Sequence, residues 1–338
     1  MQEPVGIVVL GLGRAGSIHA CNVLANPRAK LRWIVEEDVQ KAKKFLGDRN
    51  VTDVGVVPVA DTRIALDDQQ VRAALVCTPT NTHSKVIVDC LRAGKAVFCE
   101  KPVAEDVESI VSCYEEADRL GLLLFCSYNR RFDPGHGTVI KKARTGALGT
   151  IHSIITKSRD SPFPTLEFLK ISGGMFHDCA THDIDVVLRI TGEAPTTVYA
   201  QASSFAPAIA DMGDVDCITI TLKFPRGTLA TINLDRTSPY GYDQRLEVMG
   251  DKAMMISDNP KPSAIRVYSQ EGENLDKCHY SFPQRYAESY KNSLNHFLNV
   301  IEGKEEIEVT KEQVVLACQV ADACELSHKT QQVVNFKI

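Results

Sequence analysis

The sequence predicts an α/β protein with two domains, and three observations carry this prediction. In the first third of the chain, short apolar runs alternate with amphipathic helical segments, which is typical of parallel strands buried on both faces. A glycine-rich turn follows the first of these runs. After Tyr128 the pattern changes to alternation of apolar and polar residues, which indicates antiparallel strands with one buried face. A length of 338 residues suffices for two hydrophobic cores.

The first domain, residues 1–127, is expected to be a doubly wound parallel sheet. The expected strands are 5–10, 29–35, 74–77, 97–99 and 122–126. The expected helices are 17–24, 39–46, 84–93 and 103–120. Strand–helix units of this length connect parallel strands through crossover helices, so they predict this sheet type.

The second domain, residues 128–338, is expected to be α+β with a large, mainly antiparallel sheet. Its expected strands are 150–157, 197–202, 217–224, 228–235 and 245–249, and its expected helices are 177–190, 286–301 and 311–328. Within 217–224 every second residue is apolar, and Pro225-Arg226-Gly227 then turns the chain back. The polar face of such a sheet is a candidate surface for a homo-oligomer, a dimer or a tetramer.

Composition excludes several classes of function. A net charge of −5 and a pI near 6.0 argue against binding nucleic acid or an anionic membrane. No apolar run approaches the roughly 18 residues of a membrane span, and the N-terminus lacks the pattern of a signal peptide. The 11 cysteines are odd in number and never spaced Cys-x-x-Cys, so no disulfide framework and no metal site is expected. We therefore expect a cytoplasmic protein.

The glycine-rich turn predicts a dinucleotide site. Gly11–Gly16 has the spacing Gly-x-Gly-x-x-Gly between a strand and a helix, and Glu36 ends the next strand 20 residues after Gly16. This spacing places a pyrophosphate at the helix N-terminus and a carboxylate on the adenosine ribose. Glu36 favours NAD because it would repel a 2′-phosphate. Arg14 and Arg32 lie close enough in sequence to keep NADP open.

A lysine marks the end of another predicted strand. The run 97–102 reads Val-Phe-Cys-Glu-Lys-Pro, so an apolar strand ends on Glu100 and Lys101. Ligands of an open parallel sheet collect at the carboxyl ends of its strands. Lys101 is therefore expected to reach into a ligand crevice.

The stretch 173–185 carries the second set of candidate catalytic residues. Two glycines precede a predicted helix on which Asp178 and His182 stand at i and i+4, so both should project from one face, with Asp185 nearby. A histidine beside a carboxylate is a candidate general base. Two other interpretations are a capped helix with a buried structural histidine, and a metal site formed by Asp178, His182 and Asp185.

These segments resemble the glucose–fructose oxidoreductase/inositol dehydrogenase family, most closely its inositol 2-dehydrogenases. The resemblance covers nearly the whole chain, from Gly6 to about Asp322. The segments that carry it are Gly11–Gly16, Thr78–His83, Glu100–Pro102, Asn129–Pro134, Ser158–Asp160, Lys170–Phe176, Asp178–His182 and Tyr240–Asp243.

The resemblance implies an NAD-dependent dehydrogenase with a Rossmann domain. The implied cofactor-binding residues are Gly11, Gly13, Arg14, Ala15, Gly16, Glu36, Cys77, Thr78, Pro79, His83, Glu100 and Lys101. The implied substrate is a cyclic polyol of the myo-inositol type, oxidised at a secondary hydroxyl. The implied substrate-binding residues are Lys101, Arg130, Arg159, Asp178, His182 and Tyr240.

In the implied mechanism His182 takes the hydroxyl proton, Asp178 steadies the imidazolium and Lys101 stabilises the developing charge on oxygen. This requires Lys101 and His182 to converge on one cofactor-lined cavity. The chain departs from the family at Glu36, where aspartate is more usual, which keeps NADP open. It also departs at His177, which competes with His182 as the pH-sensitive group.

Other functions remain open on the same fold. They are a sugar or dihydrodiol dehydrogenase, a biliverdin reductase, whose glycine motif resembles that of Gly11–Ser17, and a non-catalytic nucleotide-sensing regulator such as the galactose-regulon repressor. Biliverdin reductases lack counterparts of Lys101 and of the Asp178/His182 pair. A regulator does not need residues that transfer a proton. The joint presence of Lys101, Asp178 and His182 therefore favours the dehydrogenase.

Overall fold

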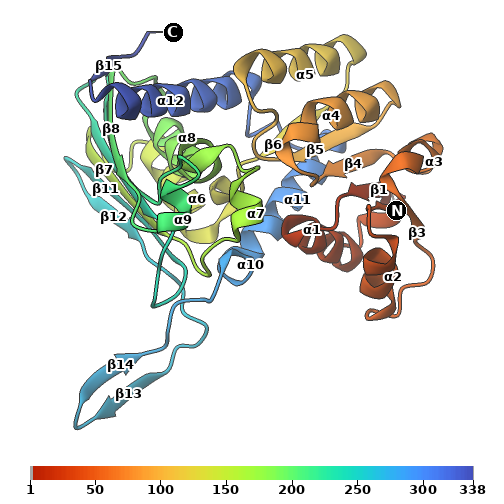
Figure 1. Cartoon of the computed structure of the whole chain (residues 1–338), viewed down its shortest axis with the longest axis horizontal. Helices are drawn as coiled ribbons and strands as arrows, with labels where there is room; N and C mark the ends of the chain where they lie inside the picture. The colour runs from red at the N-terminus through yellow and green to blue at the C-terminus, as the bar shows by residue number, and fades with distance from the viewer. Residues whose placement is uncertain (1–2, 338) are drawn as a thin grey trace. The chain divides into compact units, whose positions relative to one another are not determined.

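The protein is described by a computed structural model that covers residues 3–337 (Figure 1). The chain divides into two compact units. Unit 1 comprises the residues up to Asn129 together with Glu288–Val315, and unit 2 comprises Arg130–Ala287 and the residues from Leu316 onward. Each unit is described by itself below. The assignment of residues 1–127 and 128–338 to a cofactor domain and a substrate domain stays a prediction.

Unit 1 contains the expected parallel sheet. Its strands are β1 (Val5–Leu10), β2 (Ala29–Val35), β3 (Gly55–Val57), β4 (Ala73–Val76), β5 (Ala96–Glu100) and β6 (Leu124–Ser127). They are ordered β3-β2-β1-β4-β5-β6, and every pairing is parallel. This is the strand order of the doubly wound dinucleotide-binding fold, so the predicted fold class of this part is confirmed.

Helices connect these strands. They are α1 (Arg14–Ala25), α2 (Val39–Gly47), η1 (Val59–Asp61), α3 (Thr62–Asp67), η2 (Thr80–Thr82), α4 (His83–Arg92) and α5 (Val107–Leu120). From the C-terminal part of the chain, α11 (Ala287–Ile301) also packs on this sheet. Its Phe297 ring lies 5.5 Å from that of Phe98 on β5 and 6.1 Å from that of Phe125 on β6. Aromatic burial thus attaches α11 to unit 1.

Unit 2 is built on a seven-stranded sheet. Its strands are β7 (Ile151–Arg159), β8 (Thr197–Ser203), β9 (Cys217–Lys223), β10 (Leu229–Asp235), β11 (Asp243–Gly250), β12 (Met254–Ser257) and β15 (Val334–Asn335). The order is β12-β11-β7-β10-β9-β8-β15, and only the β7–β10 pairing is parallel. The expectation of a large, mainly antiparallel sheet is confirmed.

Apolar and polar residues alternate along the central strands, and this alternation explains which face of the sheet is covered. Ile218, Ile220 and Leu222 of β9 are buried, whereas the intervening residues are exposed. The helices of this unit are η3 (Asn129–Phe132, at its boundary), α6 (Pro134–Arg144), α7 (Leu166–Leu169), η4 (Phe176–Ala180, a π-helix), α8 (Thr181–Thr191), α9 (Pro207–Ala210), α10 (Phe282–Arg285) and α12 (Lys311–Thr330), whose first turn belongs to unit 1. The apolar face of the sheet lies under α6 and α8.

A two-stranded hairpin, β13 (Arg266–Ser269) and β14 (Gly272–Leu275), extends away from the large sheet, as Figure 1 shows. Within residues 3–337, none of the helices combines the length and the apolar character that crossing a bilayer requires.

Candidate active site

The turn between β1 and α1 can be formed only with glycine at two of its positions. Gly11 has a φ of +86°, and a Cβ there would lie 2.7 Å from the carbonyl oxygen of Cys77. A Cβ on Gly16 would lie 1.9 Å from the carbonyl oxygen of Gly11. These positions therefore allow the tight turn and the close packing of α1 on β1.

The middle glycine of the motif is different. A Cβ on Gly13 would meet no atom of the described residues within 4 Å. Gly13 is also the N-cap of α1, and within the described chain no side chain caps that helix end. The N-terminus of α1, the positive end of the helix dipole, thus has room beside Gly13 and no side-chain cap, which suits a pyrophosphate. This cradle fits a dinucleotide.

Glu36 lies directly after β2, beside this turn. Its Oε2 accepts a hydrogen bond from the Leu12 amide at 2.6 Å and lies 3.5 Å from Lys41 Nζ. The carboxylate is thereby fixed next to the glycine turn. A fixed carboxylate accepts hydrogen bonds from ribose hydroxyls and repels a 2′-phosphate, which favours NAD over NADP.

The loop after β4 is fixed by a buried histidine. Nδ1 of His83 lies 2.7 Å from the carbonyl oxygen of Pro102, and Nε2 lies 2.8 Å from that of Thr78. Burial lowers the pKa of His83, and the two contacts with carbonyl oxygens oppose this shift because they favour a protonated ring. His83 therefore ties the Thr78–Pro79 loop to the segment that follows Lys101. Its predicted contact with the cofactor stays a prediction, as do those of Arg14, Ala15 and Cys77.

β5 ends at Glu100, and half-buried Lys101 follows it, in the position that the sequence predicted. Glu100 Oε1 lies 2.7 Å from Nε2 of His19, a buried histidine on α1. Sequence reasoning missed His19. The signal that could have found it is a histidine on the buried face of the helix that follows the glycine turn. Its hydrogen bond to Glu100 fixes the carboxylate that precedes Lys101.

In unit 2 the predicted helix 177–190 begins with a wider turn. Asp178 lies in the π-helix Phe176–Ala180, which leads directly into α8 with His182 in its first turn. Because a π turn holds more residues than an α turn, the i, i+4 argument for a shared face does not apply in its simple form. Both side chains are partly exposed, whereas Ile184 and Val186 are buried.

Asp178 is paired with a buried arginine that sequence reasoning missed. Arg236 directly follows β10 and is only 1% exposed. Its Nη1 lies 3.2 Å from Oδ2 of Asp178, and its Nη2 lies 3.8 Å from Oδ2 of Asp214. Burial and the charge of Asp178 raise the pKa of Asp160. A single guanidinium thus compensates a group of neighbouring carboxyl groups.

The acidic residues that follow His182 serve a different purpose. Asp185 is buried and pairs with Arg131, with Nη2–Oδ1 at 2.5 Å and Nε–Oδ2 at 2.9 Å. Asp183 pairs with Arg130 at 2.9 Å. Because Asp185 is engaged by Arg131, it does not support a metal site with Asp178 and His182.

The three residues predicted to contact polyol hydroxyls lie in unit 2. Arg130 is buried against Asp183. Arg159, at the end of β7, donates from Nη1 to the carbonyl oxygen of Asn233 at 2.9 Å and from Nη2 to its side chain. Tyr240 is 50% exposed and donates to Asp243 Oδ2 at 2.8 Å. Their contacts with substrate stay predictions.

Comparison with known proteins agrees with this architecture. Residues 5–128 match the family described as "Oxidoreductase family, NAD-binding Rossmann fold", and residues 140–336 match the "Oxidoreductase family, C-terminal alpha/beta domain". The first match confirms NAD as the cofactor.

Individual relatives cover nearly the whole chain. Inositol 2-dehydrogenase of Rhizobium meliloti is 34% identical, over 93% of this chain and 94% of its own. Myo-inositol 2-dehydrogenase of Thermotoga maritima is 33% identical, over 98% of both chains. A solved structure of a putative myo-inositol dehydrogenase from Sinorhizobium meliloti superposes with a TM-score of 0.93 at 32% identity, covering 98% of this chain and 100% of the other. The chain therefore belongs to the Gfo/Idh/MocA family of NAD-binding oxidoreductases.

Proposed function

We propose that the protein oxidises a secondary hydroxyl of a cyclic polyol of the myo-inositol type to the ketone, with NAD as the hydride acceptor. Relatives named inositol 2-dehydrogenase support the substrate class. The observation that carries the proposal is the position of Asp178, which is held by buried Arg236 in the same helical run as partly exposed His182.

In this proposal His182 is the general base. A nitrogen of its imidazole takes the proton of the substrate hydroxyl, and the carboxylate of Asp178 stabilises the imidazolium that results. Arg236 holds the carboxylate of Asp178 in place through their ion pair. A positioned base of this kind contributes about 10²- to 10⁴-fold to the rate.

Lys101 stabilises the negative charge that develops on the same oxygen, because its ammonium group donates a hydrogen bond to it. The Gly11–Gly16 turn and Glu36 would hold the cofactor. When bound, NAD⁺ would supply the acceptor for the hydride that leaves the carbinol carbon. One hydride and one proton leave the alcohol, so the atoms and electrons of the oxidation balance.

The experiment is a substrate panel that contains myo-inositol, other inositols, aldoses and a dihydrodiol. NADH formation is followed by absorbance for the wild type and for Lys101→Met, and NAD binding is measured for both. We expect turnover with inositols and loss of turnover in the variant. NAD should still bind to the variant, with lower affinity if Lys101 also contacts the cofactor, because the Gly11–Gly16 turn and Glu36 are unchanged. Turnover only with an aldose or the dihydrodiol would replace the substrate assignment. NAD binding without turnover on any member would support the regulator.

We also propose that the protein is a cytoplasmic homo-oligomer that associates through the outer face of the seven-stranded sheet. The 11 cysteines are present as thiols, which fits a reducing compartment. The outer face carries exposed Leu229, Met249, Met254 and Ile256. Sedimentation of the wild type and of Ile256→Lys tests the surface, and the variant is expected to shift toward the monomer.

A further inference from the structure

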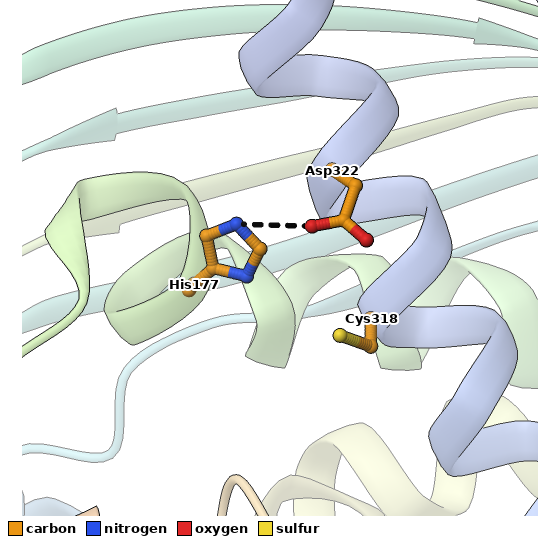
Figure 2. A group of neighbouring side chains, drawn as sticks. All are labelled: His177, Cys318 and Asp322. Carbon is orange, nitrogen blue, oxygen red and sulfur yellow. Dashed lines mark ion pairs between the residues drawn. The ribbon is translucent and has the colours of Figure 1, made fainter. Parts of the chain in front are cut away.

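Unit 2 holds a mixed group of metal-donor side chains that the proposed reaction does not use. His177 projects from the π-helix, and Cys318 and Asp322 project from α12 toward it, as Figure 2 shows. One donor atom from each residue lies within 4.8 Å of the other two. Among the described residues, this is the one group of three such side chains that could share an ion. We propose that His177, Cys318 and Asp322 bind Zn²⁺.

The distances from the His177 ring to two carboxylates of α12 fit an ion between them. Nε2 of His177 lies 3.4 Å from Oδ1 of Asp322 and 3.4 Å from Oε2 of Glu325. A direct N–H···O hydrogen bond is usually about 2.7–3.2 Å long. Two tetrahedral ligands with bonds of about 2.1 Å to zinc stand roughly 3.4 Å apart. Both separations match the edge of a zinc coordination tetrahedron, and both also lie within the range of an ion pair.

The spacing on α12 brings its donors to one side of the helix. Cys318, Asp322 and Glu325 stand at i, i+4 and i+7. Two protein ligands thus come from successive turns of a single helix, and Glu325 is the next acidic side chain along the same face. We assign the fourth coordination position to Glu325 or to water.

Packing holds both segments that carry ligands. The ring of Phe176, beside His177, lies 5.8 Å from the ring of His328 on α12. Ser327 of α12 accepts a hydrogen bond from the backbone amide of Ala200 on β8 at 3.0 Å. Because the π-helix and α12 are already packed together, little ordering is needed when the ion binds.

The donor set selects the metal. A thiolate, an imidazole and a carboxylate suit zinc, whereas calcium and magnesium prefer oxygen ligands alone. Cys318 is 8% exposed, while the side chain of Asp322 is 56% exposed. The site is thus closed on the sulfur side and open on the carboxylate side, so an ion can enter from solvent.

Bound zinc would crosslink α12 to the π-helix at the residue before Asp178. This inference concerns binding and stability, and it holds whether or not the proposed polyol oxidation is correct. Since the folded chain binds the ion and the unfolded chain lacks the arranged ligands, zinc should raise the thermal unfolding midpoint.

The experiment uses the full chain, stripped with a chelator and dialysed. Zinc binding is measured by competition with a chromophoric chelator, and Co²⁺ replaces zinc for spectroscopy. The site variants are Cys318→Ser, His177→Gln and Asp322→Asn. The matched controls are Cys278→Ser and His152→Gln, which change a thiol and an imidazole elsewhere in unit 2. Unfolding midpoints of the metal-free variants identify any that fail to fold, and exposed Asp322 makes Asp322→Asn the safest of them.

We expect one zinc ion per wild-type chain, with affinity at least about tenfold weaker in each folded site variant and unchanged in the controls. The cobalt form should show tetrahedral d–d bands and a thiolate charge-transfer band that is absent from Cys318→Ser. Wild-type protein that binds no zinc, or site variants that bind as tightly as the controls, would overturn the proposal. His177 would then be a plain ion-pair partner of the two carboxylates.

Discussion

Asp178 lies in a group of acidic residues that share one buried arginine. Arg236 is buried and contacts Asp178 and Asp214, and its charge also lowers the pKa of Asp160 against the effects of burial and of Asp178. Removal of a buried partner leaves the remaining charges uncompensated. Arg236 is thus a positioning residue for the proposed catalytic pair.

Replacing Arg236 should therefore change the pH dependence of catalysis. In Arg236→Gln the pKa of Asp160 should rise further, because the positive charge that lowers it is removed. The acidic limb of the kcat/KM profile is expected to move to higher pH by about one unit or more. Arg236→Lys keeps the charge and should restore most of the profile. If both variants lose activity equally at every pH, Arg236 serves only the fold.

Single residues could be placed from the sequence where a short sequence pattern marks their position. The glycine spacing, Glu36 at the strand end and Lys101 after β5 all follow from short patterns, and the structure places them in those positions. Arg236 lies 58 residues from Asp178, and Glu100 lies 81 residues from His19. Such pairs form only when distant segments meet, so no local pattern could identify them.

At the scale of elements, the glycines of the β1–α1 turn have two different roles. Gly11 and Gly16 are needed for the turn to form, whereas Gly13 leaves room for a ligand. Gly16 packs against the backbone of Gly11, whereas a side chain on Gly13 would enter open space among the described residues. Gly13 has a φ of −67°, which alanine adopts without strain. The two positions should therefore respond differently to the same substitution.

Gly13→Ala should fold normally and bind NAD weakly, because its methyl group would occupy the space that the pyrophosphate needs. We expect the dissociation constant of NAD to rise about tenfold or more, which corresponds to roughly 1.4 kcal/mol. Titration with NAD measures this, together with the unfolding midpoint. Gly47→Ala is the matched control, because a Cβ there also meets no described atom within 4 Å. Unchanged NAD affinity in Gly13→Ala would place the cofactor elsewhere.

The main strands of both sheets were predicted within one or two residues, and the misses have physical causes. The expected helix 103–120 begins only at Val107, because Asp106 caps it by accepting from the Ser109 amide at 2.7 Å. Helix α6 was missed because two glycines interrupt its pattern, although Asp133-Pro134 is an N-cap signal. The π-helix could not be predicted, since periodicity alone does not show an inserted residue.

At the scale of the whole molecule, a buried ion pair ties together distant parts of unit 2. Arg285 Nη1 lies 2.7 Å from Oδ2 of Asp133, and both side chains are buried. Burial alone would raise the pKa of Asp133, but hydrogen bonds from His136 and Arg285 outweigh it and hold that pKa below its usual range. The two partners stand 152 residues apart in the chain. Their pairing therefore contributes to the stability of the fold.

This pair predicts a loss of stability in acid. A carboxylate whose pKa is lower in the folded protein stabilises the fold fully above about pH 4, and the contribution disappears as the pH falls through the folded value. Asp133→Asn should lose about 3–5 kcal/mol of unfolding free energy at pH 7 and show a flatter dependence on pH in the acidic range. Urea unfolding from neutral to acidic pH measures this, with exposed Asp211→Asn as the control. Equal slopes for wild type and Asp133→Asn would contradict the assignment.

The family assignment concerns the whole molecule, because it depends on both units. The parallel sheet with its glycine turn and the mainly antiparallel sheet match the two family domains over nearly the whole chain. The resemblance drawn from short motifs is thus confirmed for the family and for NAD. The identity of the polyol stays a proposal, because substrate selection depends on side chains whose contacts no local motif determines.

The most direct measurement of the central claim is the turnover of His182→Asn with NAD and the best inositol of the panel. His182 is proposed as the base that takes the hydroxyl proton, so we predict that kcat falls about 10²- to 10⁴-fold. The affinity for NAD should stay unchanged, because the glycine turn and Glu36 are untouched. A variant that folds, binds NAD and oxidises the polyol at close to the wild-type rate would contradict the account.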